Sequence, residues 1–228
     1  MPDQNQKYED QMEEFINEVF DQNFEELRLE TGSSIAPYVK EAALQQVLLY
    51  WRYLREIAES VTDTEVRLSL PNRETRNGRE YTIEGVVDIV RDDRQTIMYD
   101  IKTHDADYVR ANINIFEQQL NIYAHIWKQL RGHSLDEAAI IATDFPEGVA
   151  NALASGDEEK LAYEVESWEP IIRIEFDPYS ADETIKEFSD VVDNIEDGIY
   201  SPREVEALGD QMPGTHERFV TRVCRNCD

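Results

Sequence analysis

The sequence predicts an α/β protein in which a mixed central sheet, including an antiparallel hairpin, is flanked by helices. Apolar residues recur at helical spacing in four long segments, whereas shorter segments alternate or are continuously apolar, as strands are. The order is helix, helix, three strands, helix, strand, strand, helix, which is typical of a sheet covered by helices. Since no repeat or low-complexity linker interrupts this order, a single domain over residues 1–228 is the simplest organisation.

The four predicted helices cover residues 6–30, 36–60, 106–131 and 181–199. In the first, Phe15, Ile16 and Val19 share one face, and a "TGSS" break follows. We therefore expect residues 1–34 to form an N-terminal helical extension. The third helix ends at Gly132, and Gly198 is the stop signal near the end of the fourth.

Five strands are predicted among these helices, at residues 63–70, 81–90, 95–102, 138–145 and 169–177. The first two are separated by a loop with an Asn-Gly turn signal, and the second and third by the short turn "RDDR". Segment 157–167 fits either element type. We expect residues 212–228 to be a C-terminal tail that carries Cys224 and Cys227.

The charge of the chain is extreme, with 49 acidic against 22 basic residues and a net charge of −27. A highly acidic surface is typical of proteins that work in molar salt, where screening removes the self-repulsion. This predicts a halophilic, archaeal, cytoplasmic protein. An acidic mimic of nucleic acid is the alternative, but the charge is spread along the whole chain. We expect no membrane association, because there is no long apolar run and no leader-like start.

The predicted hairpin over residues 81–102 carries unusual residues for a strand. With its turn centred near Asp93 or Arg94, Asp88 lies opposite Tyr99 or Asp100. Regular alternation then places Glu84, Val86 and Asp88 on one face, together with a set on the neighbouring strand: Met98, Asp100 and Lys102.

Two facing carboxylates repel each other, and a divalent cation would convert that repulsion into binding. Oxygen ligands suit Mg²⁺ or Mn²⁺, and Lys102 beside the metal could orient water or stabilise charge on a phosphate. A lone D-x-K pattern is weak, and Glu158-x-Lys160 is a rival. The rival follows what looks like a helix start rather than a strand. A solvated hairpin face is the bland alternative.

Three ordered motifs, "EGVVDIV", "MYDIKT" and "QQLNIYA", resemble the RecB-like branch of the PD-(D/E)XK nuclease superfamily. The resemblance covers about residues 35–130. It implies a restriction-endonuclease-like core and an enzyme, a Mg²⁺/Mn²⁺-dependent deoxyribonuclease. Gly85 and Asp88 match the first motif, Asp100 and Lys102 the second, and Gln119 and Tyr123 the third.

The resemblance also implies a role for each residue. Asp88, Asp100 and the carbonyl of Ile101 would hold the metal, Lys102 would assist the attacking water, and the helical pair Gln119 and Tyr123 would contact DNA or support the metal ligands. Two supporting residues are predicted, Glu65 on the preceding strand and His104 after the D-x-K strand.

The sequence departs from the family pattern in two ways. Many members have a metal-binding His on the second helix; here the first His is His104, and Glu41 is the nearest acid that could substitute. Members with an iron–sulfur cluster need four cysteines. With Cys224 and Cys227 alone, no complete cluster is expected from this chain, and the pair is either half of a metal or redox site or two free thiols.

Three functions therefore stay open. The first is a DNA nuclease, of exonuclease type, in repair, recombination or defence, with a helicase or another repair or defence protein as a partner. The second is a nucleic-acid-binding module that retains the nuclease fold but is catalytically weak or inactive. The third is an acidic interaction protein. The sequence does not distinguish single- from double-stranded DNA.

Overall fold

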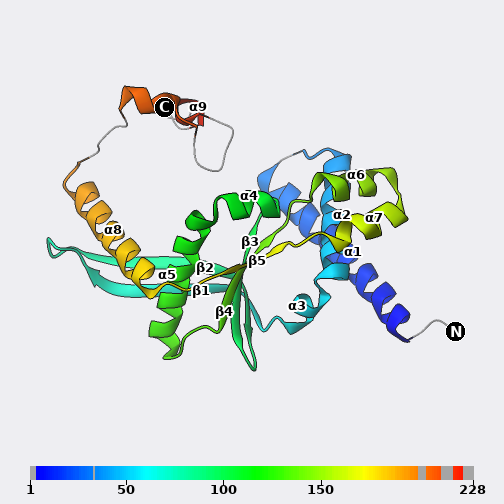
Figure 1. Ribbon diagram of the computed structural model, residues 1–228, viewed down its shortest axis with the longest axis horizontal. Helices are drawn as coiled ribbons and strands as arrows, with labels where there is room; N and C mark the ends of the chain where they lie inside the picture. The colour runs from blue at the N-terminus through cyan, green and yellow to red at the C-terminus, as the bar shows by residue number, and fades with distance from the viewer. Residues whose placement is uncertain (1–3, 33, 200–203, 212–217, 223–228) are drawn as a thin grey trace. The chain divides into compact units, whose positions relative to one another are not determined.

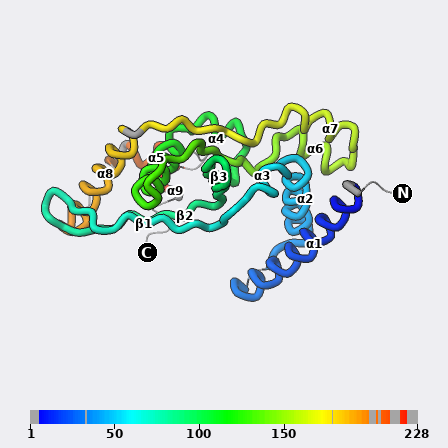
Figure 2. The backbone as a smooth tube through the Cα atoms, turned by 90° about the horizontal axis from the view of Figure 1, so that it is seen from below, coloured from blue at the N-terminus to red at the C-terminus, as the bar shows by residue number. Residues whose placement is uncertain are grey.

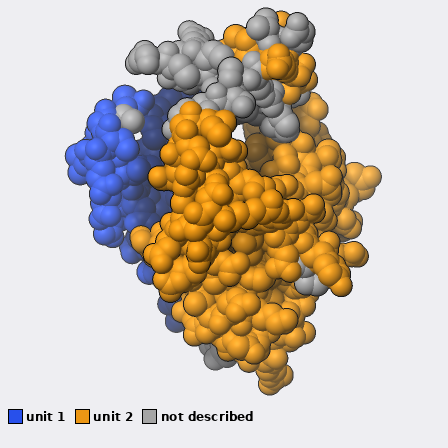
Figure 3. Space-filling view, turned by 90° about the vertical axis from the view of Figure 1, so that its left-hand side faces the viewer, with its two compact units in different colours: residues 1–61 blue, residues 62–228 orange. Residues whose placement is uncertain are grey.

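The computed structural model describes residues 4–32, 34–199, 204–211 and 218–222 (Figure 1). The chain divides into two compact units, Met1–Val61 and Thr62–Asp228, which Figure 3 distinguishes by colour. The first unit contains the helices α1 (Gln4–Thr31), α2 (Pro37–Tyr53) and α3 (Arg55–Ser60). The organisation as one domain with a helical extension and a tail stays a prediction.

Within the first unit, ion pairs join α1 to α2. Arg52 donates to Glu13 at 2.6 Å, and Lys40 lies 2.7 Å from the carboxylate of Asp21. The prediction of one helix over residues 36–60 is wrong, because the backbone leaves the helical conformation at Leu54 (φ −114°, ψ 25°). Leucine favours helices, so the sequence has no local signal for this break.

The second unit is built on a five-stranded sheet with the order β1-β2-β3-β4-β5. All neighbours are antiparallel except the parallel pair β3 and β4, which confirms the predicted mixed sheet. The strands are β1 (Asp63–Glu74), β2 (Glu80–Asp92), β3 (Thr96–Lys102), β4 (Glu137–Ala142) and β5 (Ile171–Ile174). β1 is longer than predicted, because it continues through a bulge between Leu70 and Arg73.

Helices α4 (Ala106–Ala111) and α5 (Ile113–Arg131) replace the single helix predicted over residues 106–131. The break is at Asn112, whose side-chain amide donates to the Tyr108 carbonyl at 2.9 Å. Asparagine can break a helix in this way because its side chain competes for backbone hydrogen bonds. The remaining helical elements are α6 (Glu147–Ser155), α7 (Glu158–Glu166), α8 (Pro178–Glu196), the 3₁₀ turn η1 (Val205–Gly209) and α9 (Phe219–Arg222).

The segment that fitted either element type is therefore helical. α7 begins after Asp157, whose side chain accepts a hydrogen bond from the Lys160 N–H. The rival pair Glu158 and Lys160 thus occupies the first turn of a capped helix, as its sequence context predicts. None of the described helices has the length and apolar character of a bilayer-spanning segment.

α5 covers one face of the sheet. Its buried side chains Phe116, Leu120 and Ile126 share a core cluster with Met98 of β3 and Ile140 of β4. Burying these side chains is the main stabilising contribution on this face, at roughly 1.5–3 kcal/mol for each large apolar residue.

α8 lies beside α5 and near the tip of the β1–β2 hairpin (Figures 1 and 2). At that tip, the Thr75 hydroxyl donates to the Asp193 carboxylate at 2.7 Å, and Arg79 donates to the Asp193 carbonyl at 2.7 Å. Both Thr75 and Asp193 are buried. These bonds fix α8 relative to β1 and β2.

The sequence analysis assigned the residues in the first half of β2 to the wrong faces of the sheet. Val87 and Val90 are three positions apart, yet both are fully buried in the same core cluster. A regular strand would place them on opposite faces, so the alternation shifts by one between them. The shift coincides with Glu65, which has a left-handed backbone (φ 53°) at the rung opposite Asp88.

Candidate active site

The β2–β3 hairpin places the two predicted carboxylates side by side. Its paired rungs end at Ile89 and Tyr99, so the next rung in the same register joins Asp88 to Asp100. At this rung the Asp88 side chain takes the place of a backbone hydrogen-bond acceptor, because the Ile101 N–H donates to Asp88 Oδ2 at 2.6 Å. This bond fixes the Asp88 carboxylate against the edge of β3, next to Asp100.

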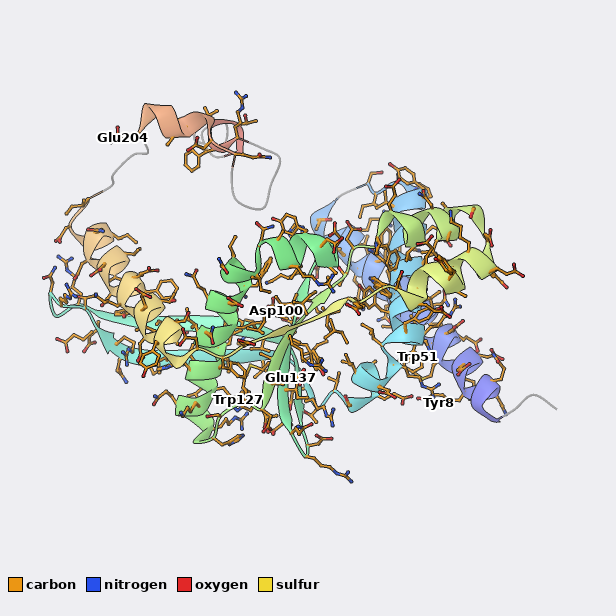
Figure 4. The ribbon with its side chains drawn as sticks, viewed as in Figure 1. Tyr8, Trp51, Asp100, Trp127, Glu137 and Glu204 are labelled. Carbon is orange, nitrogen blue, oxygen red and sulfur yellow. The ribbon has the colours of Figure 1, made fainter. Side chains whose placement is uncertain are left out.

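Asp100 lies on β3 (Figure 4). It is a buried acid, with 2% of its surface exposed. Its Oδ2 lies 2.5 Å from Lys102 Nζ, an ion-pair contact, but receives no hydrogen bond of regular geometry from the described residues. Burial raises the pKa of the Asp100 carboxyl above its ordinary value. Lys102 opposes that rise, and the neighbouring Asp88 carboxylate adds to it.

Gln119 of α5 connects the acidic and basic groups. Its amide oxygen accepts from Lys102 Nζ at 3.0 Å, and its amide nitrogen lies within 3.4 Å of Asp100 Oδ1. The same nitrogen donates to the Tyr123 hydroxyl at 2.9 Å, one helical turn further along. The structure therefore joins the D-x-K strand and the Q-x-x-x-Y helix in one hydrogen-bonded network.

The first motif needs a glycine at position 85, because the Tyr123 ring leaves no room for a side chain there. The Tyr123 ring packs so closely against it that a Cβ at position 85 would lie 2.4 Å from Tyr123 Cε1. Real side chains do not approach this closely, so any other residue would displace the ring. The close packing on Gly85 fixes the position of the Tyr123 ring, and the Tyr123 hydroxyl in turn fixes the Gln119 amide.

The residues present fit a hard divalent cation. Asp88 and Asp100 supply carboxylate oxygens, which suit Mg²⁺ and Mn²⁺, and the buried Asp100 Oδ2 has a lone pair that no regular hydrogen bond uses. Among the described residues, no group of three or more His, Cys, Asp or Glu side chains could hold a metal. The two aspartates would therefore need other ligands, such as the backbone or water.

The other predicted site residues lie in different surroundings. Glu65, exposed, is at the strained rung opposite Asp88. His104 stacks on Tyr108 with ring centroids 4.1 Å apart. Glu41 is on α2 in the other unit, where it accepts a hydrogen bond from Gln45. Cys224 and Cys227 lie outside the described residues.

Phe116 lies at the site, and the sequence analysis did not identify it. Lys102 Nζ lies 5.6 Å from the centroid of its ring, within the range of a cation–π contact. Phe116 precedes Gln119 by three positions and so faces the same way on α5. That spacing was a usable signal, because a residue that packs beneath Lys102 must lie on the face of α5 that carries the Q-x-x-x-Y motif.

The model of the PD-(D/E)XK nuclease superfamily matches residues 3–228 of this chain. The chain therefore belongs to that superfamily, as the fold and the ordered motifs indicate. Its mixed five-stranded sheet flanked by helices is consistent with the restriction-endonuclease-like core.

No curated protein matches the sequence. Among solved structures, one described as "Crystal structure of SSO0001" is similar, with a TM-score of 0.37 and 16% identity. The similarity covers 70% of this chain and 62% of that one.

Proposed function

We propose that this chain is a Mg²⁺/Mn²⁺-dependent deoxyribonuclease that hydrolyses phosphodiester bonds. One observation carries the proposal. A buried carboxylate, Asp100, lies beside a second carboxylate, Asp88, and within 2.5 Å of the Lys102 ammonium. Such a concentration of charge destabilises a fold unless it binds something, and it is typical of catalytic sites.

Each residue has a role in this proposal. Asp88 and Asp100 would hold the cation, together with the Ile101 carbonyl, and Lys102 would orient a water molecule or stabilise charge on the phosphate. Gln119 positions the Lys102 ammonium, and Tyr123 positions Gln119 through its hydroxyl. The bound cation would supply Lewis-acid activation and neutralise negative charge at the phosphate.

The test is DNA cleavage with Mn²⁺ in molar KCl, comparing the parent with Asp100→Ala and Lys102→Ala. We expect either substitution to lower the rate at least about a hundredfold, the usual effect of losing one such group. The chain provides matched controls in the rival pair, so Glu158→Ala and Lys160→Ala should retain the parental rate. Equal losses in both pairs would refute the assignment.

A second candidate is a binding module with the same fold and little or no catalysis. It is favoured by the small ligand set, since two aspartates are the only acids that converge at the site among the described residues. A parent protein that binds Mn²⁺ and DNA but cuts neither single strands nor duplexes would establish this alternative.

The cellular setting follows from charge and chemistry. We propose a halophilic archaeal cytoplasm, given the net charge of −27, and a DNA repair, recombination or defence role with a helicase or similar protein as a partner. An exonuclease is the proposed mode. Release of mononucleotides from end-labelled DNA, with no cleavage of a closed circle, would support it.

A further inference from the structure

A groove opens beside the candidate site, between β2, α5 and α8. Two of its lining residues, Gln119 and Tyr123, belong to the site network itself. Its apolar lining comes from Ile83, Ile115, Ile122 and Phe188. Because the groove and the site share side chains, a chain molecule bound at the site would continue into the groove.

The chemistry of the groove suits a nucleobase and not a phosphate. Among the residues that the structure describes, no lysine or arginine lines it, and the one charged lining residue is the acid Glu84. Phe188 is 40% exposed and Ile115 is 48% exposed, so both offer apolar surface to a ligand. An aromatic face beside aliphatic walls is the type of surface on which bases stack.

Polar groups at the groove could bind the edge of a base. Gln118 is exposed and its side chain forms no hydrogen bond with the described residues, so its side-chain amide can both donate and accept. The Thr184 hydroxyl donates to the Ser180 carbonyl at 2.8 Å, which leaves its oxygen free to accept. An unpaired base could use these groups, whereas a base in a duplex has its pairing edge occupied.

We propose that this groove binds an unpaired nucleobase next to the phosphate that the cation at Asp88 and Asp100, together with Lys102, would bind, and that the chain acts on single strands or frayed ends. The inference rests on the proposed function, because it takes the nucleic-acid strand from that proposal. The acidity of the chain supports it. With a net charge of −27, attraction of phosphates contributes little, and stacking is left as the main source of affinity.

The test measures binding of a fluorescent oligothymidylate to the Asp100→Asn protein in molar KCl. Added Phe188→Ala should weaken binding about tenfold, the scale of one lost stacking contact. Phe188→Trp should restore it, whereas Phe188→Leu, which retains apolar area but no π face, should not. The matched control is Phe176→Ala, since Phe176 is 37% exposed and lines a different cavity.

Abasic substitutions in the oligonucleotide locate the contact. At one position, removal of the base should weaken binding as much as Phe188→Ala does, and the two losses should not add. A duplex of the same sequence should bind more weakly than the single strand. Equal binding of duplex and single strand, or a Phe188→Ala loss that persists with every abasic strand, would overturn the inference.

The binding assay separates the two proposals. If the parent cuts no DNA but the Phe188 and abasic effects appear, the groove stands and the nuclease activity fails. If the parent cuts single strands and Phe188→Ala changes neither binding nor cleavage, the groove fails alone. A second copy of the chain on this surface would appear as loss of oligonucleotide binding at high protein concentration, which also counts against the inference.

Discussion

Asp100 combines burial with negative charge, and the two are normally incompatible. Burial raises its pKa, Lys102 opposes that rise, and Asp88 adds to it. Ionisation of Asp100 in the fold therefore carries a cost in stability, and buried acids of this kind are typical of binding and catalytic sites. A cation at the two aspartates would offset it.

This cost predicts that Asp100→Asn raises the melting temperature at neutral pH while it removes cleavage. The sign follows from linkage. An acid whose pKa is raised in the fold favours the folded state below its unfolded pKa of about 4, and that contribution is lost as the pH rises through the folded pKa. The gain from Asp100→Asn should therefore shrink toward pH 4. Melts followed by circular dichroism from pH 4 to 8, without metal, measure it.

Asp107→Asn is the matched control, because the Asp107 side chain is 97% exposed. It should leave the melting temperature nearly unchanged at every pH. A lower melting temperature for Asp100→Asn at neutral pH would show that the ion pair with Lys102 outweighs the effect of burial.

At the scale of single residues, much of the site could be predicted. Asp88, Asp100, Lys102, Gln119 and Tyr123 were identified as a set, and the structure brings all five together. What the sequence could not show is how they connect. The bond from the Ile101 N–H to Asp88 depends on where the strand ladder ends, which no residue type encodes.

At the scale of elements, the site depends on the contact between β2 and α5. This contact is closest where the Tyr123 ring lies on Gly85, which has no side chain to obstruct it. α5 thereby brings Gln119 within reach of both Lys102 and Asp100. The position of one helix over one strand thus sets the geometry of three functional groups.

Gly85→Ala is predicted to destabilise the fold and to impair cleavage together. The added Cβ would lie 2.4 Å from a ring carbon, so the ring or the strand must shift, at a cost of about 1–3 kcal/mol. Denaturant melts and the single-turnover cleavage rate measure the two effects. Gly209→Ala is the control, since a Cβ there meets no atom of the described residues within 4 Å. An unchanged Gly85→Ala protein would mean that Tyr123 is free to move.

The elements themselves were predicted better than their interruptions. Hydrophobic periodicity located all five strands and the main helices, but not the breaks at Leu54 and Asn112. It also assigned the wrong face to the first half of β2. Periodicity assumes a regular backbone, so it fails where tertiary contacts impose a shift, as between Val87 and Val90.

At the scale of the whole molecule, the net charge of −27 is the main source of electrostatic repulsion in the fold. Exposed acids repel each other in dilute buffer. The screening length is about 10 Å at about 0.1 M salt and falls to about 3 Å at about 1 M salt. Composition alone carries this information, and the family assignment adds nothing to it.

The charge predicts that stability depends strongly on salt. Lowering KCl from about 1 M to about 0.1 M should lower the melting temperature, because repulsion among the acids is then less screened. Thermal melts at constant pH across a KCl series measure the effect. KCl and NaCl should act alike if screening is the cause. A melting temperature that is the same at all salt concentrations would contradict both the electrostatic reasoning and the proposed halophilic setting.

The close packing of the Tyr123 ring on Gly85 also constrains which substitutions can accumulate at the two positions during evolution. A larger residue at position 85 is best accommodated by a smaller one at 123, but a smaller one at 123 leaves Gln119 without its hydrogen bond to the Tyr123 hydroxyl. If the proposed catalysis is lost in a descendant, this mutual dependence is relaxed. In a family tree, the branches on which both positions change together should therefore be those on which the aspartates have already been lost.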